Sequence, residues 1–471
     1  KVLPTDSKPT HYYEDLMAVY PLGDPHIGML AWGEESGQDW DLAIAEQKFI
    51  GVFDRLVNRT SDNSIEPALA TGWTSTSDTE WTVTLREGVK WHDGEEFTAE
   101  DFVFTYKKAM GTDEAPGRYS GFLRDIESIE IDDPLTITIT TKAPAPNLMR
   151  LLAFVPVVSQ HAGENAKTED YNSGAAMIGT GPYKFESYAP GDRAVYTRND
   201  DWWGGDNDWD SLTIRIITQP GARIAALLAG DVDVIDTVPS GDIARLKSTK
   251  GVHVASQIGQ RLMFVTLFQT EHAATMITAK DSSPLDSNPL ADLKVRKALS
   301  IAINREAIAD RIMEGAAVPS GQWLPSDSYS YAPNVMTPDY NPEAAKELLA
   351  QAGYPDGFSI TISGPNNRYP NDGPTVQAIA QMWSRIGVTT TVETEPMSSY
   401  IKKYLSGELA AGLIGYGSPT GEAGYLFSNV LLTPNRLLRQ GNFNRSGYSN
   451  PDLDQMVLSA LSTLDDATRE Q

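Results

Sequence analysis

The sequence predicts an α/β protein built from two or three domains. Its 471 residues are too many for one hydrophobic core. From 58 to about 176, strands and hairpins alternate with short helices, which is typical of an α+β region. After Val265 the pattern changes to longer amphipathic helices interleaved with strands, which is typical of an α/β domain. The chain therefore combines two kinds of domain.

One compact strand–turn–helix unit stands out at 81–105. Apolar and polar residues alternate over 81–86, which predicts a half-buried strand. The turn at 92–94 contains a histidine that we interpret as structural. Thr98 is then expected to cap a helix, with Asp101 as its capping-box partner. This unit on its own carries no chemistry.

The same periodicities define the other elements. In the first half we expect a short strand at 27–32, a helix at 44–56, a β-hairpin at 126–141 turning at 132–134, and a strand–helix–strand unit at 214–217, 221–228 and 232–235. In the second half we expect helices at 295–303, 304–313, 342–352 and 375–386, with strands at 359–362 and 389–392.

Composition excludes several classes of function. A net charge of −25 disfavours binding to nucleic acid phosphates. No apolar run is long enough to span a membrane. The absence of cysteine excludes disulfides and thiolate sites, and the six scattered histidines form no ligand pair. The acids of 206–210 have partial calcium-loop spacing but lack its glycine and glutamate. We therefore expect no catalytic residue, no metal site and no cofactor.

The run W-T-V-T-L-R-E-G-V-K-W-H-D-G-E-E-F-T-A-E-D-F at 81–102 closely resembles a family signature. It is that of the extracellular solute-binding proteins of family 5, the dipeptide-, oligopeptide- and nickel-binding receptors of ABC importers. Further segments resemble the same family in the same order: 66–70, 179–183, 199–203, 226–233, 294–298 and 344–349. Each segment is weak alone, but their order makes the resemblance specific.

The resemblance implies a bilobal periplasmic-binding-protein fold, in which two α/β lobes are joined by a hinge and an α+β insert belongs to the first lobe. By this resemblance the domains are expected to be 1–45 (first lobe, N-terminal part), 46–178 (insert), 179–260 (first lobe, second part) and 261–471 (second lobe). The family's C-terminal return to the first lobe would then be missing.

The resemblance also implies the function. The protein is expected to be a non-enzymatic receptor that captures a small solute, a di- or oligopeptide, by hinge closure. It would act as a monomer at the periplasmic or extracellular face of the cell membrane and deliver the solute to an ABC importer permease. An oligosaccharide receptor of the same family is the alternative, and a hydrolase on a bilobal scaffold is a distant one.

The resemblance places the ligand-binding residues on loops that border the cleft. In the second lobe, Arg368 would bind a ligand carboxylate, unless it is a solvent-facing loop arginine. Glu422 would accept a ligand ammonium, unless it is an exposed loop acid. The remaining candidates are Trp32, Glu34 and Ser36 in the first lobe, and Trp323, Asn366, Tyr416, Gly417 and Ser418 in the second. The aromatic rings among them suit sugars as well as peptides.

Overall fold

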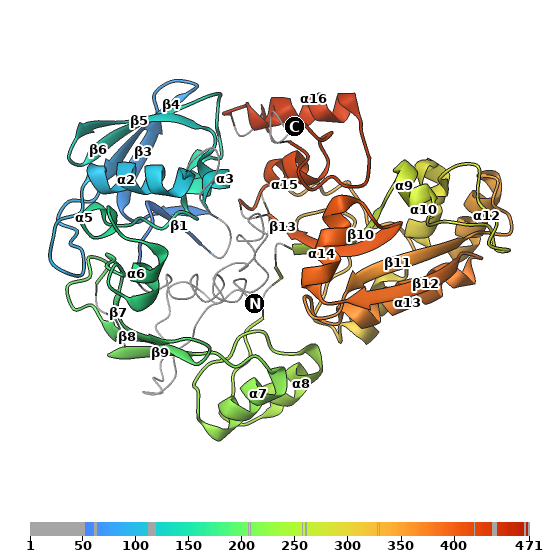
Figure 1. Cartoon of the computed structure of the whole chain (residues 1–471), viewed down its shortest axis with the longest axis horizontal. Coiled ribbons are helices and arrows are strands. Elements are labelled where there is room, and N and C mark those ends of the chain that lie inside the picture. Colours follow the sequence, from blue (N-terminus) through green and yellow to red (C-terminus); the bar gives the residue numbers. More distant parts are fainter. Residues whose placement is uncertain are drawn as a thin grey trace.

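The computed structural model describes residues 52–60, 64–111, 119–205, 207, 209–256, 258–259, 261–326, 328, 330–418, 420–435, 440–465 and 468–469. In this part of the chain the strands form sheets β1-β2, β3-β4-β6-β5, β7-β8-β9 and β10-β13-β11-β12. The first three sheets lie together in one lobe, and the fourth forms a second lobe beside it (Figure 1). The predicted bilobal α/β architecture is confirmed.

The first lobe is built from antiparallel sheets and short helices. In chain order its elements are β1 (Val57–Arg59), β2 (Ile65–Pro67), β3 (Ala70–Ser75), β4 (Glu80–Leu85), α2 (Ala99–Met110), α3 (Ser120–Leu123), β5 (Ile126–Asp133), β6 (Thr136–Thr141), α4 (Leu148–Leu152), α5 (Gln160–Gly163), α6 (Thr168–Ser173), β7 (Tyr183–Ala189), β8 (Arg193–Arg198) and β9 (Ser211–Arg215). Helices α7 (Pro220–Ala229) and α8 (Ser240–Ser248) follow.

The second lobe contains a mixed sheet flanked by longer helices. Its elements are β10 (Arg261–Leu267), α9 (Glu271–Ala274), η2 (Pro289–Ala291), α10 (Leu293–Ile301), α11 (Arg305–Ala307), η3 (Ile308–Ile312), α12 (Pro342–Gln351), β11 (Ser359–Pro365), α13 (Asp372–Arg385), β12 (Thr389–Glu395), α14 (Met397–Ser406) and β13 (Ala411–Gly417). Helices α15 (Ala423–Val430) and α16 (Pro451–Leu461) follow. Strand β11 runs parallel to β12 and β13, and β10 runs antiparallel to β13.

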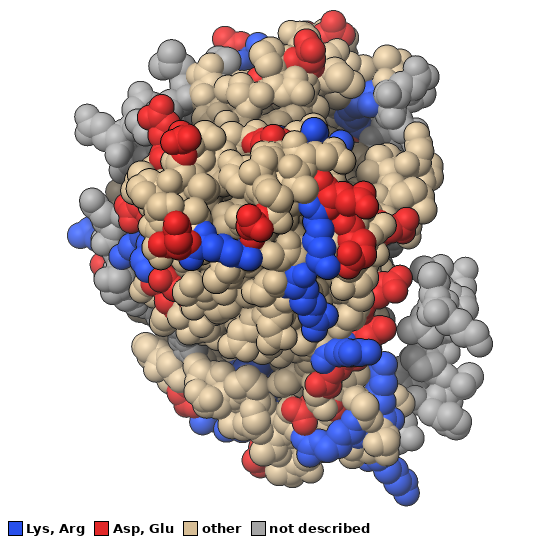
Figure 2. Space-filling model, turned by 90° about the vertical axis from the view of Figure 1, so that its right-hand side faces the viewer, with Lys and Arg blue, Asp and Glu red and all other residues tan. Residues whose placement is uncertain are grey.

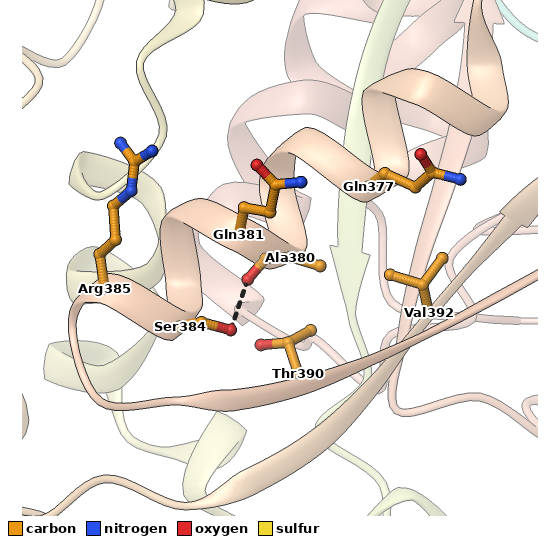
Figure 3. Close-up of a pocket in the computed structure, with 7 residues that line it drawn as sticks. All are labelled: Gln377, Ala380, Gln381, Ser384, Arg385, Thr390 and Val392. Atoms are coloured by element: carbon orange, nitrogen blue, oxygen red, sulfur yellow. Dashed lines mark hydrogen bonds between the residues drawn. The ribbon is translucent and has the colours of Figure 1, made fainter.

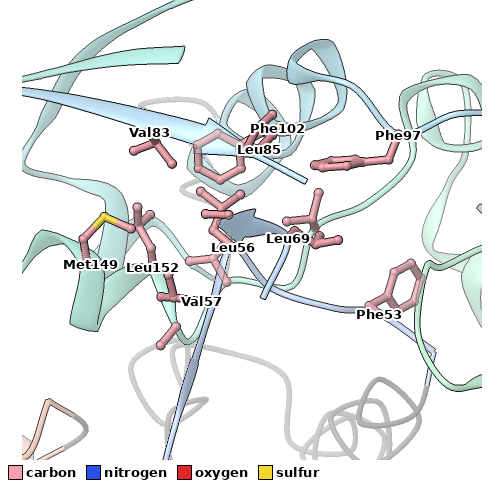
Figure 4. Close-up of a cluster of buried hydrophobic side chains, with 14 of the residues drawn as sticks. Phe53, Leu56, Val57, Leu69, Val83, Leu85, Phe97, Phe102, Met149 and Leu152 are labelled. Carbon is pink, nitrogen blue, oxygen red and sulfur yellow. The ribbon is translucent and has the colours of Figure 1, made fainter. Parts of the chain in front are cut away.

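Each lobe has its own hydrophobic core. The first core runs from Val52 to Tyr196 and thus unites β3, β4 and β6 with β7 and β8. Figure 4 shows Leu56 and Leu69 beneath Phe102 of α2 in this cluster. The second core packs α10, α12 and α13 on the sheet of β11 and β13. The predicted domain boundaries themselves stay a prediction.

Most elements with a strong local pattern agree with expectation. The helix predicted at 98 begins after Thr98, which forms the capping box with Asp101. The hairpin at 126–141 is present, but its turn lies at 134–135 and not at 132–134, because β5 extends through Asp133. The helix predicted at 304–313 is a short α-helix, α11, continued by the π-helical turn η3.

Two predictions about the first lobe are wrong. Residues 232–235 form no strand, and β9 instead pairs antiparallel with β8, so the strand–helix–strand unit does not exist. Of the helix predicted at 44–56, residues 52–56 are not helical, and 44–51 lie outside the described residues. At 232–235 the local pattern resembled a strand, but a strand also needs a neighbour for its backbone hydrogen bonds. At 52–56 the carbonyls of Arg55 and Leu56 instead accept hydrogen bonds from the amides of Leu69 and Ala70. The strand predicted at 27–32 lies outside the described residues.

His92 connects the turn of the strand–turn–helix unit to a distant segment. Its Nε2 donates to the carbonyl oxygen of Gly181 at 3.0 Å, and its Nδ1 accepts from the amide of Gly179 at 3.3 Å. Both contacts require a neutral ring with its proton on Nε2. Burial lowers the pKa of His92 to about 4. The structural interpretation of this histidine is confirmed.

Replacing His92 should reduce the acid sensitivity of the protein. Below about pH 6.5 the unfolded chain binds a proton at this histidine while the folded chain does not, down to about pH 4. Unfolding is therefore favoured by up to about 3 kcal/mol across this window. His92→Gln lacks this acid destabilisation. At pH 7 its thermal midpoint should be lower than that of the wild type, and the difference should shrink as the pH falls to 4.5. Exposed His272→Gln should follow the wild-type profile. Parallel profiles for the wild type and His92→Gln would contradict this account.

Candidate functional site

The predicted residues of the second lobe converge on one edge of its sheet. Strands β11 and β13 are parallel, so their carboxyl ends point to the same edge. Asn366 and Arg368 follow β11, and Tyr416 and Gly417 end β13. Antiparallel β10 begins at this edge, with Arg261 opposite Gly417. The topology thus brings Arg368 beside residues about 50 positions later in the sequence, and Arg261 opposite a residue more than 150 positions later.

Tyr369 joins the two loops at this edge. Its hydroxyl accepts a hydrogen bond from the amide of Gly415 in β13 at 3.0 Å. The guanidinium carbons of Arg261 and Arg368 lie 5.8 Å and 5.4 Å from the centre of its ring, within the range of cation–π attraction. Burial lowers the pKa of both arginines, which stay charged near neutral pH.

Arg368 is partly buried, which disfavours the alternative of a solvent-facing loop arginine, and its role in binding stays a prediction. The physical reason is the loop: Asp372 accepts from the amides of Arg368 and Tyr369 at 2.9 Å and 3.0 Å and folds the segment back onto the sheet. Sequence analysis missed Arg261. Its position as the first residue of a strand that faces β13 becomes informative only when the pairing is known.

The aromatic candidates Trp323 and Tyr416 are packed against neighbouring rings and do not project into solvent. Trp323 lies edge to face against Phe264 of β10, with ring centres 4.6 Å apart. Tyr416 lies edge to face against Phe443 at 5.0 Å. Burial and a hydrogen bond to Tyr425 raise the pKa of Tyr416 well above its usual value. Both rings are partly buried, which leaves limited flat surface for a ligand.

Asn366 and Ser418 differ in their surroundings. Asn366 is exposed, and its amide donates to the carbonyl of Glu395 at 3.0 Å. Ser418 is only 2% exposed. Its hydroxyl donates to the carbonyl of Glu422 at 2.7 Å and accepts from the amide of Glu422 at 3.1 Å. These bonds shape the loop that ends where α15 begins.

Glu422 is buried between two arginines. Its side chain is 3% exposed, and its Oε1 lies 3.2 Å from Nε of Arg150 and 3.2 Å from Nη2 of Arg469. The interpretation of Glu422 as an exposed loop acid is therefore wrong. The local sequence reads as a polar loop, but α15 docks against the first lobe, where Tyr425 packs on the core. Arg150 belongs to α4 of that lobe, so this ion pair connects the two lobes.

Trp32, Glu34 and Ser36 lie outside the described residues, so their predicted role stays a prediction. The calcium-loop spacing at 206–210, which the sequence analysis disfavoured, is not tested, because Asp206 and Asp208 lie outside the described residues. Among the described residues, no three histidine or acidic side chains are grouped as metal ligands.

A groove of about 470 Å³ lies elsewhere in the second lobe (Figure 3). It runs between α13 and the edge strand β12 and is lined by Gln377, Ala380, Gln381, Ser384, Arg385, Thr390 and Val392. None of the predicted binding residues lines it. On the outer face of this lobe, basic side chains lie next to acidic ones (Figure 2).

Three hydrogen-bonded side chains in the first lobe resemble a hydrolytic triad. Ser159 Oγ lies 2.8 Å from Nδ1 of His161, whose Nε2 lies 2.6 Å from Oδ2 of Asp93. However, Ser159 is 2% exposed, and its Oγ accepts from the amide of Ala162 at 3.1 Å as the cap of α5. A buried capping hydroxyl cannot reach a substrate, so this cluster gives the hydrolase alternative no support.

Removing the Glu422 charge should destabilise the protein. In Glu422→Gln two guanidiniums lose their buried counter-charge, which costs about 3 kcal/mol. In Arg150→Met the carboxylate keeps Arg469 as a partner, so the loss should be about 1 kcal/mol. Differential scanning calorimetry of both variants checks the order. Asp192→Asn, which breaks an exposed pair with Arg193, should unfold as the wild type does. If Glu422→Gln had the thermal unfolding midpoint of the wild type, the buried ion pair would contribute nothing to stability.

Comparisons with known proteins agree with this geometry. Residues 64–436 match the model of the bacterial extracellular solute-binding proteins, family 5 Middle. The chain is 30% identical to heme-binding protein A of Haemophilus influenzae, covering 87% of this chain and 76% of that protein. It is 27% identical to the dipeptide-binding protein of Escherichia coli, covering 81% and 73%. The structure of HbpA2 from Haemophilus parasuis superposes with a TM-score of 0.74 at 27% identity, covering 90% and 84%. The chain thus belongs to family 5 of the bacterial extracellular solute-binding proteins.

Proposed function

We propose that this protein captures a di- or oligopeptide between its lobes and delivers it to the permease of an ABC importer at the outer side of the membrane. The observation that carries the proposal is the pair of guanidiniums, from Arg261 and Arg368, over the ring of Tyr369. Their strand-end position is the place where the second lobe faces the first (Figure 1).

Two fixed guanidiniums suit the carboxylate of a peptide. A guanidinium binds a carboxylate through two parallel hydrogen bonds, and partial burial strengthens such charge-assisted bonds. Tyr369 is 6% exposed and holds both arginines near one ring, so little side-chain entropy remains to be lost on binding. The relative from Escherichia coli is a dipeptide-binding protein, which favours the same class of solute.

Closure of the lobes is supported by contacts between distant segments. Arg150 of the first lobe meets Glu422 of the second. At another place the side-chain amide of Asn371, before α13, donates to Ser240 of α8 at 2.9 Å. Such polar contacts can form and break with hinge motion. None of the helices in the described part of the chain has the length and apolar character needed to cross a membrane.

An oligosaccharide is the alternative solute of the same receptor. Sugar rings stack on flat aromatic faces. Trp323 and Tyr416 are instead packed edge to face against Phe264 and Phe443. The arginine pair therefore favours a solute with a carboxylate over an uncharged sugar.

Arg368→Ala should weaken binding of a peptide with a free carboxylate, for example tri-alanine, by about 1.5–3 kcal/mol, the range of charge-assisted hydrogen bonds. Isothermal titration calorimetry measures the change. For tri-alanine with an amidated C-terminus, the same substitution should weaken binding much less, because this peptide has no carboxylate to pair with Arg368. Arg385→Ala, an exposed arginine of α13, serves as the matched control. Equal affinity of wild type and Arg368→Ala for tri-alanine would remove the main support for a peptide.

A further inference from the structure

The start of helix α8 contacts two segments of the second lobe. Ser240, the first residue of the helix, is 8% exposed, and its Oγ accepts a hydrogen bond from the side-chain amide of Asn371 at 2.9 Å. The carboxylate of Glu314 lies over the next residue, Gly241, where a Cβ would be 3.4 Å from its Oε2 and 3.5 Å from its Oε1. This carboxylate is therefore close to the first turn of α8, where the helix dipole favours negative charge.

Helix α8 is held to the first lobe through α7 and β9. Arg215 of β9 donates to the carbonyl oxygen of Asp231, after α7, at 3.2 Å. Arg223 of α7 donates to the carbonyl oxygen of Thr237, before α8, at 3.1 Å. These bonds tie both helices to the sheet of the first lobe, so we expect α8 to move with that lobe. A change in the angle between the lobes would then separate the start of α8 from the second lobe.

Asn371 directs its side chain to the other lobe instead of capping its own helix. Asparagine directly before a helix commonly accepts from the first amides of that helix. Here the side chain forms no capping hydrogen bond to α13. Its amide nitrogen donates to the carbonyl oxygen of Ile312, in the second lobe, at 2.7 Å as well as to Ser240. The bond to Ile312 lies within one lobe and holds the amide in position for Ser240.

Strained backbone is concentrated at this contact. Among the described residues, four other than glycine have a positive φ, and three of them are Thr237 at 50°, Glu314 at 52° and Asn371 at 52°. Asparagine tolerates this conformation, whereas it is costly for glutamate and more so for β-branched threonine. Such strain persists only where the surrounding structure holds it, and it clusters in switch regions. The strain therefore points to a contact that does more than connect two surfaces.

The segment that contains Asn371 also carries the proposed carboxylate site. Arg368 and Tyr369 precede Asn371, and Asp372 accepts hydrogen bonds from the amides of Arg368 and Tyr369 at 2.9 Å and 3.0 Å. Residues 368–372 thus form one hydrogen-bonded turn, with the guanidinium near one end and the Asn371 amide near the other. A solute that fixes Arg368 also fixes the turn that presents Asn371 to α8.

We propose that Asn371 and Glu314 form a latch with the start of α8, which holds the lobes together and couples their closure to occupancy of Arg368. The inference rests on the proposed function and deepens it: Asn371 is a positioning residue that acts through lobe closure. The latch stabilises only the closed arrangement of the lobes. It therefore raises the closed fraction of the solute-free protein and, with it, the apparent affinity for the solute.

Distances between spin labels test the latch in the solute-free protein. The chain has no cysteine, so two introduced cysteines can be labelled selectively. Glu130→Cys in β5 and Lys402→Cys in α14 place one label at an exposed position of each lobe. Double electron–electron resonance then measures how the distances between the lobes are distributed, with no assumption about the solute.

Two substitutions weaken the latch from opposite sides. Ser240→Ala removes the acceptor on α8 and leaves the bond between Asn371 and Ile312 in place, and Glu314→Gln removes the charge beside the helix start. In the solute-free protein each should shift the distribution to longer distances. For Ser240→Ala the affinity for tri-alanine, measured by calorimetry, should fall about two- to tenfold, the range of one neutral hydrogen bond. At saturating tri-alanine its distances should match those of the wild type, which a general distortion would not produce.

Matched controls come from the same neighbourhood. Ser248→Ala removes an exposed serine at the end of α8 whose hydroxyl bonds its own helix, and Glu306→Gln neutralises an exposed acid of α11. Both should match the wild type in both measurements. Glu314 is itself exposed, so Glu314→Gln keeps the test decisive if Ser240→Ala fails to fold. Unchanged solute-free distances in the latch variants overturn the latch while the peptide assignment stands. If the wild type does not bind tri-alanine, the proposed function fails, and the distances still decide whether the latch exists.

Discussion

A buried carboxylate connects the two lobes, and the loop between β13 and α15 depends on it. Glu422 lies directly before α15 and contacts Arg150 of the first lobe and Arg469 near the end of the described chain. Desolvating an ion pair is costly, so such a contact is stable only when several groups compensate it together. Here the compensation comes from segments that are remote in sequence. The orientation of α15, and with it the loop after β13, therefore depends on how the lobes are placed.

The arrangement of strands gives the site its second constraint. Parallel strands end at one edge of a sheet, and residues that follow them are brought together whatever their separation in sequence. Strands β11 and β13 use this rule, and antiparallel β10 adds Arg261 at its start. Tyr369 then connects the two loops, because its hydroxyl is hydrogen-bonded to the amide of Gly415 while its ring lies near two guanidiniums.

Sequence analysis succeeded where local patterns decide the structure. Helices α7, α12 and α13 begin and end within a few residues of the predicted positions, because amphipathic periodicity and caps are local properties. It failed where a distant partner decides. Residues 232–235 alternate like a strand but form none, and Glu422 reads as a loop acid until α4 and the chain end are placed beside it. Loops carry the binding residues, so the candidate site was less predictable than the fold.

The strongly acidic composition is compatible with a site rich in arginine. A net charge of −25 sets the long-range field, but that field is screened over about 8 Å at physiological salt. At the sheet edge the nearest charges are those of Arg261 and Arg368, which are partly shielded from water and would act most strongly on a solute bound there as proposed. Overall charge thus favours solubility and repels large polyanions, whereas in the proposed binding mode these two arginines bind the carboxylate of the solute.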